Sequence, residues 1–280
     1  MTHRHTFQIG DITGHIFTDG TVNNKAANMF ATAPQDTLQQ ALATYHLQPD
    51  SIPVFFNMAL LETPTHKMML DTGIGHQPDN ATHGFLYENL AQLNIKFEAI
   101  DTVILSHAHS DHISANTDAH GNPLFPNADY LIWHSEWDYW THPDTLRQAD
   151  MHTTAVRRNL LGIQDRFQQL TDAVEIVDGV QIVPAFGHTV GHIAVHVQSE
   201  NQHFIYTADA FHHPLHITHP DWVYYRDVNF EQSHQSRLRL LELAADTNAL
   251  FTGYHMQFPA LGRITRTEEG YQWHSVTTNS

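Results

Sequence analysis

Cysteine is absent from this chain of 280 residues, and basic residues are scarce. Without cysteine the chain can form no disulfide, no thiolate nucleophile and no cysteine-ligated metal site. The 13 Lys and Arg stand against 30 Asp and Glu, which gives a formal net charge of −17. This balance argues against nucleic acid and against an anionic membrane surface as partners, because both attract clustered positive charge.

Long apolar runs are also missing. No stretch reaches the roughly 18 apolar residues that a membrane-spanning helix needs. The opening MTHRHTFQIG has no apolar segment of the kind found in a secretory signal. With 41 % hydrophobic and 15 % charged residues, the composition is that of a globular protein with a sizeable core. We therefore expect a cytoplasmic protein with no membrane partner.

Short apolar strand patterns alternate with helical patterns along the whole chain. The region 7–20 predicts short strands broken at Gly10, Gly14 and Gly20. Further strands are predicted over residues 54–61, 67–70, 102–105, 174–177, 181–183, 193–197, 204–206 and 249–252. Helices are predicted over residues 36–46, 85–93, 146–161 and 231–245. This alternation indicates the α/β or α+β class, and no linker interrupts it, so we expect one domain over residues 1–280.

Histidine is unusually abundant, with 25 residues, and its densest group follows a predicted strand. Ser106–His112 reads SHAHSDH, which places His107, His109, Asp111 and His112 within six residues. Imidazole nitrogens and a carboxylate suit Zn²⁺ or another first-row divalent ion. His107 and His109 share one face of an extended segment and can reach one ion, while Asp111 and His112 can project towards a neighbouring ion.

Three later segments each place a ligand-type side chain after an apolar strand. They end in His188 of GHTVGH, in Asp209 after FIYTA, and in His255 after LFTGY. Strand ends that converge on a cleft are the usual place for such side chains. Each signal alone is weak, because a His or Asp at a strand end is commonly a turn former or a helix cap, but their order is informative.

In this order, the H-x-H-x-D-H motif, the GHTVGH segment, the later Asp and the late His resemble the metallo-β-lactamase-fold metallohydrolase superfamily. The resemblance extends from Asp71-Thr72-Gly73 to His255. Four segments are also similar to the branch that holds N-acyl homoserine lactonases and methyl parathion hydrolase: Ile9-Gly10 to Asp19-Gly20, Phe125-Pro126-Asn127-Ala128, Glu136-Trp137-Asp138-Tyr139-Trp140, and His255-Met256-Gln257-Phe258-Pro259.

The resemblance implies a four-layer αββα sandwich and two divalent ions, most simply Zn²⁺, with Mn²⁺, Fe²⁺ or Co²⁺ as alternatives. One ion would be held by His107, His109 and His188, and the other by Asp111, His112 and His255, with Asp209 and a hydroxide between them. Open sites of this kind are catalytic rather than structural. His192 would lie behind the ligands or pack on the strand. Asp71 would also lie behind the ligands, although a plain strand-to-turn role is an equal alternative.

Departures from family patterns narrow the function. His109 excludes the redox-active di-iron pattern with Glu at that place, and the lack of Cys excludes lactamases that use a Cys ligand. Some lactonases of the branch carry a carbonyl-polarising Tyr three residues after the bridging Asp; this chain has His212 there. An imidazole can also donate to an oxyanion, so His212 is a catalytic candidate, or it is merely one of many His.

The expected function is hydrolysis of a lactone or ester, with a phosphotriester also open, by a metal-bridging hydroxide. Asp209 is the first candidate to protonate the leaving group and Asp111 the second. In a lactonase this activity would be quorum quenching. A glyoxalase II-like thioesterase and a His-rich metal-binding protein without activity remain alternatives. The substrate would be a small molecule, and a homodimer stays open.

Aromatic residues near the motifs could line an apolar pocket, although at 10 % aromatic content most are expected in the core. They are Trp133, Trp137, Trp140, Trp222, Tyr224 and Tyr225.

Overall fold

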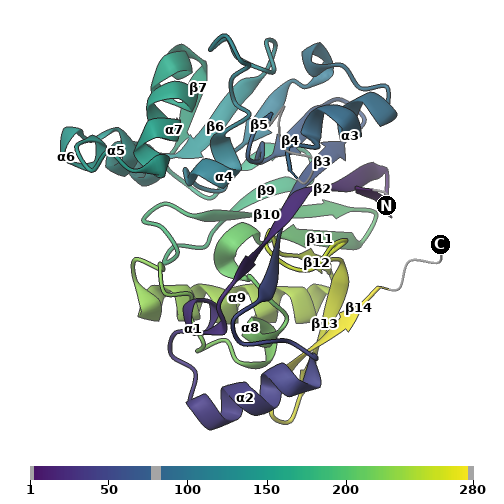
Figure 1. Ribbon diagram of the computed structural model, residues 1–280. Helices are drawn as coiled ribbons and strands as arrows, with labels where there is room; N and C mark the ends of the chain where they lie inside the picture. The colour runs from purple at the N-terminus through teal and green to yellow at the C-terminus, as the bar shows by residue number, and fades with distance from the viewer. Residues whose placement is uncertain (1–2, 77–82, 277–280) are drawn as a thin grey trace.

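Two β-sheets lie face to face in the computed structural model, which describes residues 3–76 and 83–276. Each sheet has seven strands, and helices cover their outer faces (Figure 1). The architecture is the four-layer αββα sandwich that the sequence predicts. Among the described residues, no helix has both the length and the apolarity to cross a bilayer.

The first sheet contains the strands of the first half of the chain, paired in chain order. They are β1 (Arg4–Ile9), β2 (Ile12–Asn24), β3 (Ile52–Glu62), β4 (Lys67–Leu70), β5 (Thr102–Ile104), β6 (Asp129–Trp133) and β7 (Phe167–Leu170). The strands from β1 to β4 are antiparallel, and those from β4 to β7 run parallel. The carboxyl ends of β4 to β7 therefore meet at one edge of the sheet.

The second sheet contains the strands of the second half. They are β8 (Glu175–Val177), β9 (Val180–Pro184), β10 (Ile193–Ser199), β11 (Gln202–Tyr206), β12 (Leu250–Thr252), β13 (Gly262–Thr267) and β14 (Gly270–Ser275). Only the pair β11 and β12 is parallel within the described part of this sheet.

The α-helices of the described residues are mostly short. They are α1 (Ala26–Met29), α2 (Gln35–Thr44), α3 (Leu86–Gln92), α4 (Ser110–Ile113), α5 (His134–Thr141), α6 (Pro143–Leu146), α7 (Met151–Asn159), α8 (Leu215–Thr218) and α9 (Phe230–Thr247). The 3₁₀ turns are η1 (Phe97–Ala99), η2 (Leu161–Arg166) and η3 (Ala208–Ala210). Figure 1 shows α3, α5 and α7 on the first sheet, α9 along the second, and α2 at the far end of the long strands β2 and β3.

Both sheets contribute side chains to one apolar core. Ile16 and Leu60 from the first sheet and Val195 and Phe204 from the second belong to the same buried cluster. Burial of this surface is the main force that holds the layers together. The assignment of residues 1–280 to one domain stays a prediction, and residues 1–2, 77–82 and 277–280 of that range lie outside the described residues.

The N-terminal prediction is wrong at Gly14 and Gly20, which lie inside β2 and do not end a strand. The reason for Gly14 is packing: a Cβ there would lie 2.2 Å from the ring of Phe7 on the paired strand β1. Gly14 therefore makes room for a buried aromatic ring, which is a known use of glycine inside a strand. Gly10 does mark a turn, with φ of +51°.

The predicted helix over residues 146–161 is divided. One helix, α6, ends at Leu146, and the next, α7, begins at Met151. Ala149 between them has φ of +53°, which a helix interior does not allow. The Asp150 side chain then caps α7, because its Oδ1 accepts a hydrogen bond of 2.8 Å from the Thr153 amide. The remaining predicted helices and strands are present with ends shifted by a few residues.

Arg237, within α9, is fully buried and joins this helix to the loop that follows η3. Its guanidinium donates to the carbonyl oxygens of Ala210 and Trp222 at 2.6 Å each. Its Nη2 also lies 3.5 Å from Oδ2 of Asp227. A buried charge requires such partners, so the guanidinium holds the end of η3 and the residues just before α9 against this helix.

We expect Arg237→Ala to lower the free energy of unfolding by about 3–5 kcal/mol, because it leaves the buried Asp227 carboxylate without its cation. Arg239→Ala is the matched control, since this exposed arginine lies two residues further along the same helix. It should change stability by no more than about 0.5 kcal/mol. Urea denaturation measures both, and equal effects would contradict the role of Arg237.

Candidate metal centre

All seven predicted ligands lie in segments that follow strands, two of them in α4 and one in η3. His107, His109, Asp111 and His112 follow β5, and the other three follow β9, β11 and β12. The structure groups His107, His109, His188 and Asp209 in one set and Asp111, His112 and His255 in another, with ligand atoms within 4.8 Å of one another. The structure thus brings the predicted ligands together; their binding of metal stays a prediction.

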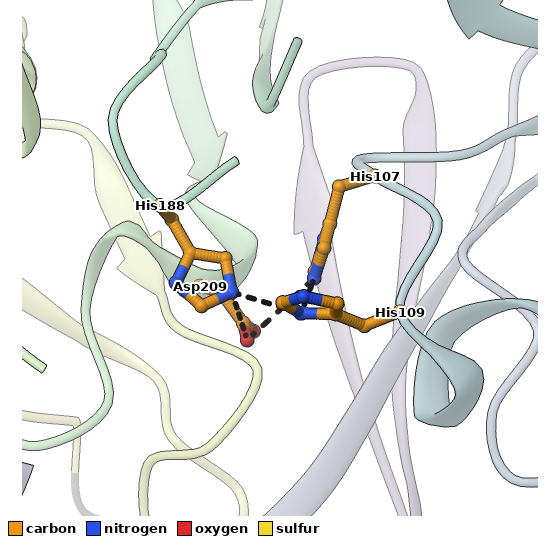
Figure 2. Close-up of side chains that lie close together, drawn as sticks. All are labelled: His107, His109, His188 and Asp209. Atoms are coloured by element: carbon orange, nitrogen blue, oxygen red, sulfur yellow. Dashed lines mark hydrogen bonds and ion pairs between the residues drawn. The ribbon is translucent and has the colours of Figure 1, made fainter. Parts of the chain in front are cut away.

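The first set contains three imidazoles whose nitrogens converge (Figure 2). His109 Nδ1 lies 2.9 Å from His107 Nε2 and 3.1 Å from His188 Nε2. Asp209 Oδ2 lies 3.3 Å from His188 Nε2 and 3.8 Å from His107 Nε2. The single lone pair of His109 Nδ1 cannot accept hydrogen bonds from both rings at once, so hydrogen bonding does not explain why the three nitrogens converge. Nitrogen ligands of one tetrahedral zinc ion lie about 3.3 Å from one another, close to the distances seen here. The spacing fits a divalent ion.

The second set lies on the other side of Asp209. Asp111 Oδ2 is 3.5 Å from His255 Nε2 and 3.7 Å from His112 Nε2. Asp209 reaches the same rings, with its Oδ2 3.1 Å from His255 Nε2 and its Oδ1 3.2 Å from His112 Nε2. Within the described residues, His112 Nε2 and Asp209 Oδ1 are buried with no hydrogen-bond partner. Buried polar atoms normally have partners, so this pair also fits a cation between them.

The rings are oriented by hydrogen bonds on their far sides. His188 Nδ1 donates to Asp227 Oδ1 at 2.8 Å, and His112 Nδ1 donates to Asp71 Oδ2 at 2.9 Å. His255 Nδ1 donates to the carbonyl oxygen of Phe55 at 2.8 Å. A hydrogen on Nδ1 leaves the lone pair on Nε2, and in each case Nε2 is the atom that faces the cluster.

Asp71 lies behind the ligands, which was one of the two alternatives that the sequence left open. Its carboxylate accepts from the Ser106 amide and hydroxyl at 2.8 Å each, from His112 and from the Tyr206 hydroxyl at 2.8 Å. It thereby joins the end of β4 to β11 and to the loop after β5. The residue has φ of +59°, a conformation that Asp tolerates better than most residues.

His192 contacts the backbone of the site and belongs to neither set. Its Nδ1 donates to the carbonyl oxygen of Ala185 at 3.0 Å, and its Nε2 accepts from the Asp209 amide at 3.1 Å. His192 therefore positions Asp209 through the main chain.

Glu136 begins the Glu136–Trp140 segment that resembles the lactonase branch, but the sequence did not predict its structural role in the site. It is fully buried and accepts from the amides of Ala108 and Gly191 at 3.0 and 2.9 Å and from Trp140 Nε1 at 2.7 Å. It thus joins the loop of His107 and His109 to the loop of His188. Gly191 permits this approach, because a Cβ there would lie 2.5 Å from the Glu136 nitrogen.

The electrostatics of the site favour neutral imidazoles in the first ligand set and positive charge in the second. Burial, aided by the neighbouring imidazoles, lowers the pKa of His107 and of His109 well below the ordinary value, so both keep a free lone pair. Burial also opposes charge on His112, yet the carboxylates of Asp209, Asp71 and Asp111 raise its pKa well above the ordinary value. These carboxylates stabilise a cation where the second set converges.

A cleft of about 1060 Å³ opens over the two sets. Its lining includes His109, Asp111, His188, Asp209 and His255. Of the aromatic residues proposed from sequence, Tyr224 and Tyr225 line it. The tryptophans Trp133, Trp140 and Trp222 are buried in the core and Trp137 packs against it, as expected for most of these residues.

His212 lies beside Asp209, with its Nε2 3.6 Å from Asp209 Oδ2. Its ring is stacked on the ring of His255, with 5.1 Å between the ring centres and 16° between the ring planes. The centre of the Tyr224 ring lies 4.4 Å from that of His212. The side chain is buried, and among the described residues its ring nitrogens have no hydrogen-bond partner. Tyr224, rather than His212, forms the cleft wall at this point. The catalytic role of His212 stays a prediction.

A family model and several solved structures match this chain. The sequence model of the metallo-beta-lactamase superfamily matches residues 53–253. The structure of AidC, described as a dizinc quorum-quenching lactonase with a bound product, is 25 % identical with a TM-score of 0.88, over 99 % of this chain and 98 % of that chain.

Two further structures share the fold at lower identity. The hydrolase AbOPH of the beta-lactamase superfamily is 20 % identical with a TM-score of 0.89, over 100 % of this chain and 99 % of that chain. A probable metal-dependent hydrolase from Staphylococcus aureus is 21 % identical with a TM-score of 0.81, over 97 % of this chain and 100 % of that chain.

We expect Asp227→Asn to weaken metal binding about 10- to 100-fold, because the amide no longer holds the Nδ1 hydrogen of His188 as a carboxylate does. Competition with a chromogenic chelator measures the affinity without reference to activity. Asp246→Asn is the control, because this carboxylate pairs with Arg266 on the surface far from the ligands. An unchanged affinity in Asp227→Asn would show that the contact does not orient His188.

Proposed function

The chain belongs to the metallo-β-lactamase superfamily and is a hydrolytic enzyme, and we propose that it uses a binuclear metal centre to open a lactone or cleave a related ester. The observation that most supports this proposal is the position of Asp209. This one carboxylate lies within 3.3 Å of His188 in the first set and within 3.1 Å of His255 in the second. A shared carboxylate between two open ligand sets, at the base of a cleft, is suited to two adjacent ions.

The His and Asp donors match Zn²⁺, the ion that we propose first, with Mn²⁺, Fe²⁺ and Co²⁺ as alternatives. Divalent ions at such a site supply an activated water molecule at neutral pH and polarise a carbonyl oxygen. The protein holds the donors in place from behind: Asp71, Asp227 and the Phe55 carbonyl fix three of the rings. Glu136 and His192 fix the loops that carry the others.

Proton transfer to the leaving oxygen falls to a carboxylate that borders the cleft. Asp209 and Asp111 both line it beside the imidazole ligands, and the Asp111 side chain is 23 % exposed against 3 % for Asp209. Asp209 lies between the sets and is the first candidate, while Asp111 has better access to solvent. Tyr224 forms the wall above His212, so its ring would contact the substrate before His212 does.

Cleavage of a lactone is supported by the similarity to AidC, which covers nearly the full length of both chains. The cleft volume of about 1060 Å³ also exceeds what a lactone ring alone would fill, and it allows a substantial acyl group. An open cleft of this size suits a small-molecule substrate. A homodimer and a cytoplasmic location stay predictions.

The decisive experiment combines metal analysis with a hydrolysis panel. We expect purified protein reconstituted with Zn²⁺ to hold about two ions per chain and to hydrolyse an N-acyl homoserine lactone or an aryl ester. His109→Ala should lose metal and should lower kcat/KM by roughly 100-fold or more, because it removes a ligand rather than an outer partner. His274→Ala, on the edge strand β14, is the control and should behave as wild type.

Three results would change this assignment. Full turnover in a metal-free His109→Ala protein would favour a metal-binding protein whose ions are not catalytic. Hydrolysis of S-lactoylglutathione in preference to lactones and esters would favour the thioesterase. A ratio of one ion per chain at full activity would contradict the binuclear proposal.

A further inference from the structure

Two hydrogen-bond donors face each other at the mouth of the cleft. Arg226 Nη1 lies 3.4 Å from His152 Nε2, and both side chains line the cleft with the ligand His109. His152 lies in the first turn of α7, whereas Arg226 belongs to the segment before α9, so the fold brings together two distant parts of the chain.

The hydrogen on His152 Nε2 is fixed by the other side of the ring. Its Nδ1 accepts a hydrogen bond of 3.1 Å from the Ser110 amide, so Nδ1 carries no hydrogen. A neutral imidazole then carries its hydrogen on Nε2. Nε2 is therefore a donor directed at Arg226, whose guanidinium has only donors. The two groups cannot satisfy each other.

Arg226 has capacity left for a ligand. Within the described residues, its Nε donates to the Tyr225 hydroxyl, and its guanidinium lies 5.3 Å from the centre of the Tyr225 ring. The contact with His152 brings two donors together and uses no acceptor. The second arginine of the cleft, Arg158, is already engaged with Thr117 Oγ1 and with the carbonyl oxygen of Asp118. Arg226 is also exposed, so a substrate can reach it.

We propose that His152 and Arg226 form a subsite for a carboxylate group of the substrate. A planar guanidinium beside a second N–H donor matches the two oxygens of a carboxylate, and a permanent cation favours an anion over a neutral carbonyl. This proposal rests on the proposed function and narrows its substrate class to lactones or esters that carry an anionic group on the side away from the leaving oxygen.

The position of His152 fixes how close this carboxylate lies to the reacting bond. Its ring is 4.5 Å from the ring of His109, and its Nδ1 accepts from the amide of Ser110, which begins α4 and precedes Asp111. The subsite therefore adjoins the first ligand set. A short linker between the carboxylate and the scissile ester would span the two.

The test compares 4-nitrophenyl esters of matched shape on zinc-loaded protein. The anionic probes are the 4-nitrophenyl monoesters of succinic, glutaric and adipic acid, which differ only in linker length. The neutral probes are the methyl-capped forms of the same esters and 4-nitrophenyl valerate. We expect wild type to cleave at least one anionic monoester with a kcat/KM about tenfold above that of its methyl-capped form.

Arg226→Gln should lower kcat/KM about 10- to 100-fold for the anionic monoester and less than about twofold for valerate, because only the charged pair is lost. Arg226→Lys should restore part of the preference, since it keeps the charge without the planar fork. His152→Gln keeps a donor near the Nε2 position and should retain the preference. Arg266→Gln removes a distant surface charge and should leave the preference unchanged.

Two results would overturn the carboxylate subsite and leave the proposed function intact. One is an equal loss of kcat/KM for anionic and neutral esters in Arg226→Gln. The other is a wild-type protein that cleaves valerate but does not prefer the anionic monoesters. If the methyl-capped ester is cleaved as well as the anionic monoester, and both better than valerate, the subsite binds a neutral oxygen acceptor. That result would also overturn the carboxylate subsite. Wild type that cleaves none of the esters, nor a lactone, would overturn both proposals.

Discussion

The buried carboxylate of Asp209 is the interaction on which the site depends. It lies among imidazoles of both ligand sets, with contacts of 3.1 to 3.3 Å to His112, His188 and His255. Burial alone would raise the pKa of Asp209, yet His255 and His112 hold it well below the ordinary value. A carboxylate that stays ionised without solvent requires positive charge close by, so the surrounding rings and any bound cation are coupled to it.

The same requirement explains why so many polar residues behind the ligands are buried. Asp71, Glu136 and Asp227 are each held by hydrogen bonds from more than one segment, and Arg237 neutralises Asp227 from α9. Together they join loops that come from both sheets. Rings that are fixed in this way need little rearrangement when an ion binds, which is the condition for strong and selective coordination.

The sequence predicts the ligands well because their spacing is local and their chemistry is narrow. SHAHSDH leaves few alternatives to a metal site, and the strand-end positions of His188, Asp209 and His255 follow from apolar runs. The outer partners are another matter. Glu136 belongs to a segment that resembles the lactonase branch and Asp227 to none of the motifs, but the sequence predicts a partner for neither. Only the folded chain places them against Gly191 and His188.

The prediction of strands and turns also fails where a contact with a distant residue determines the local structure. Gly14 looks like a turn residue, but the ring of Phe7 on β1 requires its lack of a side chain. The edge strand β7 has only four residues, FQQL, and its two adjacent glutamines interrupt the apolar alternation that marks a strand. Helix-forming composition over 146–161 likewise conceals the break at Ala149, which contains neither glycine nor proline.

Net charge and local charge have opposite effects at the cleft. The chain has a formal charge of −17, so its overall field repels anionic molecules at long range. Within the cleft the local sources of positive charge are Arg158, Arg226 and any ions held by the two ligand sets. At physiological ionic strength the long-range repulsion is screened beyond about 8 Å, whereas direct contacts inside the cleft are screened less. Selection of a charged substrate therefore has to occur at short range, through the geometry of individual donors rather than through steering.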